Sequence, residues 1–74
     1  MSKLPQLSGQ QVCKAFATIG YQFDRQKGSH IVLRRGDPPH RRLVIPDHKT
    51  IAKGTLRAII RQAGLTVDEF LSLL

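Results

Sequence analysis

The sequence predicts a single α+β domain of two layers, in which helices cover one face of a three-stranded antiparallel sheet. Apolar residues follow a helical period at the two ends of the chain and a strand period in the middle. Two turn sequences divide the middle into three short strands. The predicted order is one helix, three strands and two helices. The 74 residues are enough for one domain and one core.

The first helix is predicted over residues 9–19. Ser8 is a candidate N-cap and Gln11 follows three residues later, which is a capping box. Gly20 suits the position that ends a helix. Residues 1–6 are predicted to form a flexible leader. The residues that share the apolar face at helical spacing are Val12, Ala15, Phe16 and Ile19.

The three strands are predicted to begin near residues 21, 30 and 42. Since alternate residues of a strand share a face, one set points toward the helices: Tyr21, Phe23, Ile31, Leu33, Leu43 and Ile45. The opposite face stays open and carries His30, Val32, Arg34, Arg42 and Val44. Strict alternation would also turn Arg25 and Lys27 inward. The first strand must therefore twist, bulge or leave the sheet before Arg25.

Two helices are predicted at the C-terminal end. Gly54-Thr55 opens the first and Gly64 ends it, while Thr66 and Glu69 form a capping box for the second. The apolar face of the first comprises Leu56, Ile59, Ile60 and Ala63, and that of the second comprises Val67, Phe70, Leu71 and Leu74.

The charge balance predicts a polyanionic partner. Twelve Lys and Arg against five Asp and Glu give a net charge of +7, which suits nucleic acid, an anionic membrane or an acidic protein. Lys53, Arg57 and Arg61 recur every four residues on one predicted helix, which is typical of a ridge that faces phosphates. The alternative is that these charges only keep a small domain soluble. The four aromatic side chains fit the core, which argues against a base-stacking platform.

Several classes are excluded by composition. One cysteine excludes a disulfide within the chain, and the spacing of His30, His40 and His48 is not that of a zinc site, so we expect no metal and no cofactor. No apolar run is long enough for a transmembrane helix, and the N-terminus lacks the apolar region of a signal peptide. We therefore expect a cytoplasmic protein without a membrane partner.

His30 is the strongest candidate for chemistry. It follows Lys27-Gly28-Ser29 at the start of a strand, and Arg34 lies on the same strand. A histidine transfers protons near neutral pH, and nearby cations can hold a phosphodiester. Gly28 would let the backbone approach a phosphate closely. On RNA the 2′-hydroxyl would be the nucleophile, so neither a protein nucleophile nor a metal is needed. The alternative is a hairpin turn followed by an ordinary, half-exposed histidine.

A second histidine follows the third strand. His48 lies in Pro46-Asp47-His48-Lys49, where it is a candidate auxiliary acid–base group or RNA contact. Asp47 beside it is placed to orient the ring. The alternative is a loop residue with local hydrogen bonds only.

Four segments together resemble the HicA toxin family. They are QKGSH at 26–30, VIPDH at 44–48, GTLRAI at 54–59 and QAGL at 62–65. The resemblance extends from about Leu7 to Leu74. It implies a fold like that of double-stranded-RNA-binding domains and the activity of an mRNA interferase, with His30 as the catalytic residue.

The resemblance also implies a partner. A HicB antitoxin would bind the toxin and cover the surface around His30, and oligomers would form mainly through that complex. The leading hypothesis is a type II toxin that cleaves mRNA and leaves a cyclic phosphate and a 5′-hydroxyl. Lys27, Gly28, Ser29 and Arg34 would contact the RNA, together with Lys53, Arg57 and Arg61. The alternative is a non-catalytic RNA-binding module, which contacts phosphates and 2′-hydroxyls without cutting.

Overall fold

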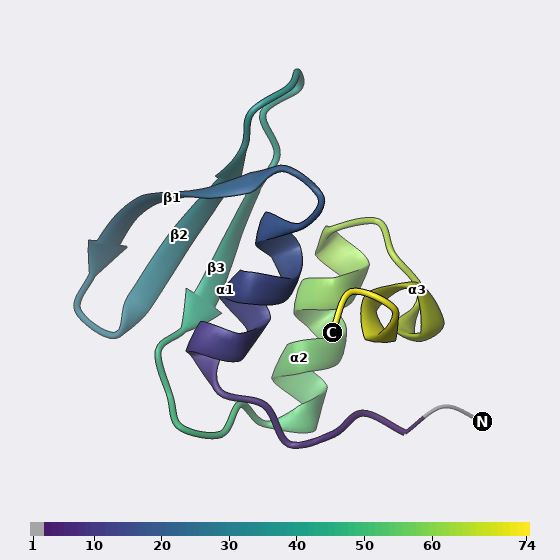
Figure 1. Cartoon of the computed structure of the whole chain (residues 1–74). Helices are drawn as coiled ribbons and strands as arrows, with labels where there is room; N and C mark the ends of the chain where they lie inside the picture. Colours follow the sequence, from purple (N-terminus) through teal and green to yellow (C-terminus); the bar gives the residue numbers. More distant parts are fainter. Residues whose placement is uncertain (1–2) are drawn as a thin grey trace.

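The computed structural model describes residues 3–74 and has the predicted order of elements (Figure 1). Three strands form one antiparallel sheet in the order β1-β2-β3. Helices α1 and α2 cover the same face of this sheet, and α3 packs against α2. The predicted two-layer α+β class is confirmed. The elements are α1 (Gly9–Ala17), β1 (Tyr21–Lys27), β2 (His30–Arg35), β3 (Arg42–Pro46), α2 (Lys53–Gln62) and α3 (Val67–Leu71).

Both predicted capping boxes are formed. At the start of α1, the Ser8 hydroxyl accepts a hydrogen bond from the backbone N–H of Gln11 at 3.1 Å, and the Gln11 side chain accepts from the N–H of Ser8 at 2.8 Å. Thr66 and Glu69 repeat this exchange at the start of α3, with the same two distances. These bonds satisfy N–H groups that a helix start otherwise leaves without partners.

The C-terminal end of α1 differs from the prediction, whereas the C-terminal end of α2 agrees with it. α1 ends at Ala17 rather than at residue 19, because tighter turn bonds such as Ile19 N–H to Phe16 O, at 3.1 Å, replace the helical pattern. The last residue of α2 is Gln62 and its C-cap is Ala63, so Gly64 directly follows the helix as predicted, with a φ of +77° that glycine adopts without strain.

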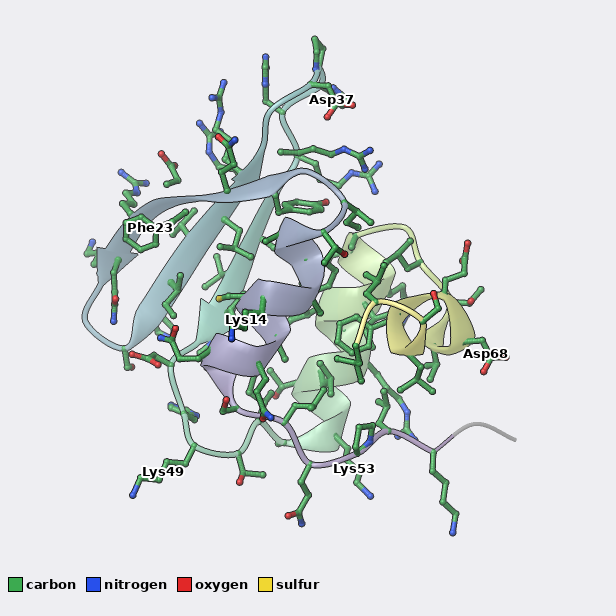
Figure 2. All side chains as sticks on the ribbon, viewed as in Figure 1. Lys14, Phe23, Asp37, Lys49, Lys53 and Asp68 are labelled. Carbon is green, nitrogen blue, oxygen red and sulfur yellow. The ribbon has the colours of Figure 1, made fainter. Side chains whose placement is uncertain are left out.

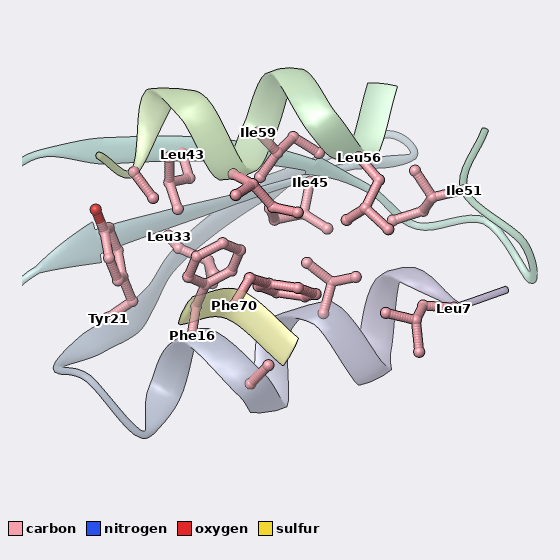
Figure 3. Packing of buried hydrophobic residues seen from close by; sticks show 14 of the residues in the cluster. Leu7, Phe16, Tyr21, Leu33, Leu43, Ile45, Ile51, Leu56, Ile59 and Phe70 are labelled. Atoms are coloured by element: carbon pink, nitrogen blue, oxygen red, sulfur yellow. The ribbon is translucent and has the colours of Figure 1, made fainter. Parts of the chain in front are cut away.

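The core lies between the sheet and the two helices that cover it (Figure 3). The inward positions of β2 and β3 and the apolar face of α2 are buried as predicted. Phe16 of α1 has its ring centroid 5.5 Å from that of Tyr21 and 5.3 Å from that of Phe70. In α3 only Phe70 is fully buried. Leu74 is exposed, contrary to prediction, because it lies beyond the end of that helix.

A β-bulge in β1 sets which face Arg25 and Lys27 occupy. Phe23 pairs with Leu33, but the next pair is Arg25 with Val32, so Asp24 is the extra residue. Lys27 then pairs with His30. Since paired residues share a face, both cations lie on the open face of the sheet. The bulge was one of the alternatives that the sequence left open.

The prediction that Phe23 is buried is wrong. Its pairing with Leu33 places it on the helix side of the sheet, yet 63% of its surface is exposed. α1 covers only the first part of β1, so the space between them is a groove with Phe23 on one side and Lys14 on the other (Figure 2). Cys13 is half-buried at this groove. Burial and the negative charge of Asp47 raise the pKa of its thiol.

The segment before α1 contributes to the core. Leu4, within the predicted flexible leader, is only 3% exposed, and Leu7 is also buried. Residues 1 and 2 of that leader lie outside the described part of the chain. The carbonyl of Leu7 accepts a hydrogen bond of 2.8 Å from the N–H of Ile51, a buried residue that the sequence analysis did not identify. The N-terminal segment and the loop before α2 therefore run side by side.

Candidate functional site

A two-residue turn positions His30 at the start of β2. Lys27 and His30 form the last pair of the β1–β2 hairpin, and Gly28 and Ser29 connect them. Gly28 has a φ of +59°, and glycine is favoured at the first central position of such a turn. Lys27 and His30 are both exposed and share the open face of the sheet. The turn therefore presents a histidine directly beside a cation.

The structure brings His30 and His48 to one hollow. His30 is paired across the sheet with Pro46, so the chain leaving β3 passes close to the start of β2. The hollow has a volume of about 360 Å³, and we call it the histidine hollow. Its lining residues are His30, Val44, Pro46, His48, Ile51, Ala52 and Thr55. Two histidines 18 positions apart in sequence thus face the same space.

Backbone bonds hold the loop that carries His48. The N–H of Asp47 donates to the carbonyl of Ser29 at 2.6 Å, and the N–H of Gly9 donates to the carbonyl of His48 at 2.9 Å. A Cβ atom at position 9 would overlap the carbonyl oxygen of Pro46, so glycine is needed for this close approach. The loop is therefore anchored to the turn before His30 and to the start of α1.

The carboxylate of Asp47 binds two glutamines. One oxygen accepts from the side-chain amide of Gln10 and the other from that of Gln26, each at 3.2 Å. The Gln26 amide also donates to the carbonyl of Gly28 at 3.2 Å. Both oxygens of the Asp47 carboxylate therefore bind side chains of α1 and β1, and the orientation of the His48 ring by Asp47 stays a prediction.

The other predicted RNA contacts on the sheet lie farther away. Arg34 occupies the open face, but it is paired with Gln22 and Arg42 at the other end of β2. It is four residues from His30, which is about 13 Å along a strand. Arg42 forms a long ion pair with the bulge residue Asp24 at 3.7 Å. The open face is thus cationic over its whole length, with the histidine at one end.

The predicted ridge on α2 is exposed but does not line the histidine hollow. Lys53 is the first residue of α2 and directly follows Ala52, which lines the hollow. Arg57 and Arg61 lie one and two turns farther along the helix. Figure 2 shows Lys49 and Lys53 at the same end of the molecule, far from Asp37 in the β2–β3 loop. Only Lys53 of the ridge is therefore close to the hollow.

The β2–β3 loop lies at the opposite end of the sheet and has contacts of its own. The guanidinium of Arg35 binds the Asp37 carboxylate at 2.9 Å, and this hydrogen bond holds the pKa of Asp37 below its usual value. His40, in the same loop, is half-buried with its Nδ1 3.3 Å from the carbonyl oxygen of Arg35. His40 is therefore separate from the histidine hollow.

Residues 3–74 contain no group of three or more His, Cys, Asp or Glu side chains that could hold a metal ion. No helix within these residues is long and apolar enough to cross a membrane.

Comparison with known proteins identifies the family. A search of curated proteins finds no match to the chain. A family model described as the HicA toxin of bacterial toxin-antitoxin matches residues 9–65, which is more than half of the 74 residues. The matched region runs from the start of α1 to the end of α2 and includes the whole histidine hollow. The chain therefore belongs to the HicA toxin family of bacterial toxin–antitoxin systems.

Proposed function

We propose that this toxin is an endoribonuclease that cleaves mRNA, with His30 as its catalytic residue. The observation that carries the proposal is the placement of His30. It is exposed, it lines a hollow of about 360 Å³, and it lies beside Lys27 on a face rich in arginine. A histidine can transfer protons, and a cation beside it can hold the phosphate and stabilise the charge that develops on it, so the pair can support phosphodiester cleavage.

The nucleophile in this reaction is the 2′-hydroxyl of the RNA. His30 takes part in proton transfer, while Lys27 and the turn of Gly28 and Ser29 hold the scissile phosphate. Arg34 binds a phosphate farther along the strand. Lys53, Arg57 and Arg61 bind flanking backbone along α2, where positive charge adds affinity without sequence preference. The products are a 2′,3′-cyclic phosphate and a 5′-hydroxyl.

Product analysis under metal-free conditions tests this function. Labelled single-stranded RNA is incubated with the purified protein in EDTA, and the ends of the fragments are identified. We expect cleavage that leaves cyclic phosphate and 5′-hydroxyl ends, and no cleavage of DNA of the same sequence, because DNA lacks the nucleophile. Fragments with 5′-phosphate ends, cleavage only when Mg²⁺ is added, or no cleavage of RNA would contradict the proposal.

We propose further that a HicB-type antitoxin inhibits the toxin by covering the open face of the sheet. A ribonuclease in the cytoplasm must be restrained, and this face carries His30. Val44 is 49% exposed on it, and Arg25, Arg34 and Arg42 surround the apolar centre formed with Val32. Such a face suits a partner that supplies acidic side chains around an apolar contact. Assembly into larger oligomers would then depend on the complex.

Charge reversal on two faces of the molecule tests this surface. Arg25→Glu places a negative charge on the open face, where it would repel an acidic partner, so we expect antitoxin binding to weaken about tenfold or more. Arg61→Glu makes the same change of charge on the exposed side of α2 and is expected to leave the affinity nearly unchanged. Calorimetry measures both affinities. Loss of binding in the Arg61 variant alone would place the interface on the helical side.

A further inference from the structure

We propose that His48 is a second catalytic residue, which donates a proton to the leaving group while His30 accepts one from the nucleophile. We further assign Asp47 as the positioning residue that holds His48 at the histidine hollow. This inference rests on the proposed ribonuclease function and deepens it, since it gives each histidine one proton to move. It applies to the cleavage of an RNA phosphodiester next to a 2′-hydroxyl.

The composition of the hollow supports this assignment. Among the residues that line it, His30 and His48 are the only two with side chains that titrate. The others are apolar except for the hydroxyl of Thr55. A histidine changes its charge between pH 5 and 8, so at neutral pH one imidazole can accept a proton while another donates one. Lys27 and the arginines of the open face can bind phosphate through charge-assisted hydrogen bonds.

The two histidines are held by separate elements that Asp47 joins. His30 lies on β2 after the Gly28-Ser29 turn, and His48 lies in the loop after β3. The backbone N–H of Asp47 binds the carbonyl of Ser29 at 2.6 Å. Its carboxylate receives the amide of Gln26, which also binds the carbonyl of Gly28. Both contacts connect the His48 loop to the turn before His30.

Two more contacts fix the loop from the other side. The second oxygen of the Asp47 carboxylate accepts the Gln10 amide of α1 at 3.2 Å, and the carbonyl of His48 accepts the N–H of Gly9 at 2.9 Å. Asp47 and the backbone of His48 itself are therefore tied to secondary structure. Catalytic groups need such support, because misplacement by about 1 Å can cost about 100-fold in rate.

The proposed step balances without any other reactant. His30 accepts the proton of the 2′-hydroxyl as the 2′-oxygen forms a bond to phosphorus. The bond between phosphorus and the 5′-oxygen breaks, and protonated His48 gives its proton to that oxygen. The strand is thereby divided into a 2′,3′-cyclic phosphate and a 5′-hydroxyl. Exchange of protons with water then restores His30 and His48 to their starting states.

A substrate changed at one atom distinguishes this role from a structural one. In a short RNA, sulfur replaces the bridging 5′-oxygen at the bond that is cut. A thiolate leaves without being protonated, so this substrate does not need a general acid. We expect His48→Ala to lower the cleavage rate of the oxygen substrate about 10²- to 10⁴-fold, but that of the sulfur substrate less than about tenfold.

Two further variants complete the test. His48→Gln keeps a polar side chain of similar size without the acid and is expected to behave as His48→Ala does. Asp47→Asn removes one acceptor from the contacts with Gln10 and Gln26. We expect it to lower the rate on the oxygen substrate about tenfold or more, and to have much less effect on the sulfur substrate. His40→Asn, far from the hollow, is the control and should leave both rates unchanged.

The cleavage rates of these variants decide whether His48 and Asp47 have the assigned roles. If a His48 variant slows the cleavage of the oxygen and sulfur substrates by the same factor, His48 is not the general acid. The same conclusion follows if the variant cleaves both substrates as fast as the native protein does. If Asp47→Asn leaves the oxygen rate unchanged, Asp47 does not position His48. If the native protein fails to cleave the oxygen substrate, the proposed ribonuclease function itself fails, which is a separate result.

Discussion

Phe16→Ala is expected to lower the free energy of unfolding by about 3–5 kcal/mol. Phe16 is fully buried in α1, and its ring contacts those of Tyr21 and Phe70 between the sheet and the helices. Alanine would leave a cavity at this contact. Because a domain of this size has only a few kcal/mol of stability in total, most of it would be lost. Urea denaturation followed by circular dichroism measures the change.

Phe23→Ala is the matched control, because it deletes the same side chain at an exposed position. Phe23 is 63% exposed at the groove beside α1, so we expect a loss below about 1 kcal/mol. Equal losses for the two variants would mean that Phe23 is as buried as Phe16 and that the groove is closed. A small loss for Phe16→Ala would contradict the packing shown in Figure 3.

Local patterns were enough to predict most of the secondary structure. The capping boxes at Ser8 and Thr66 depend on residues three apart, and both are formed. The alternation of residue types in β2 and β3 correctly predicted which face of these strands is buried, because the residues on one face are apolar and those on the other include charged side chains. The need for a twist or bulge before Arg25 also followed from alternation, and the structure has the bulge.

Features that depend on coverage by a distant segment were not predictable in the same way. Phe23 has the pattern of a buried residue, but its exposure depends on how far α1 extends over the edge strand. Leu4 and Ile51 have no periodic neighbours, and they are buried because the N-terminal segment pairs with the loop before α2. Their apolar side chains were the only available signal.

The candidate site was predicted in parts. The turn before His30 is local and was identified from Gly28 and its neighbours. The meeting of His30 with His48 depends on the register of β2 and β3, in which His30 lies opposite Pro46. The contacts of Asp47 with Gln10 and Gln26 join residues up to 37 positions apart, for which one sequence gives no signal.

His30→Ala is expected to lower RNA cleavage about 10²- to 10⁴-fold, because it removes proton transfer in the reaction. Binding of RNA is expected to remain nearly unchanged. Affinity comes mainly from the lysine and arginine side chains, and their number and placement stay the same. The side chain of His30 is exposed, so its removal leaves no cavity in the core and the free energy of unfolding should change little.

His40→Asn provides the control, since it removes a histidine at the opposite end of the sheet. Asparagine also tolerates the positive φ of 58° at this position. We expect this variant to cleave and bind as the native protein does.

The measurement that tests the central claim most directly is cleavage and binding of one labelled RNA, in EDTA, by the native protein and its His30→Ala variant. The proposed function predicts that both proteins bind the RNA with similar affinity and that only the native protein cuts it. If both bind and neither cuts, the chain is an RNA-binding module without catalysis. If both cut at the same rate, the catalytic group is not His30.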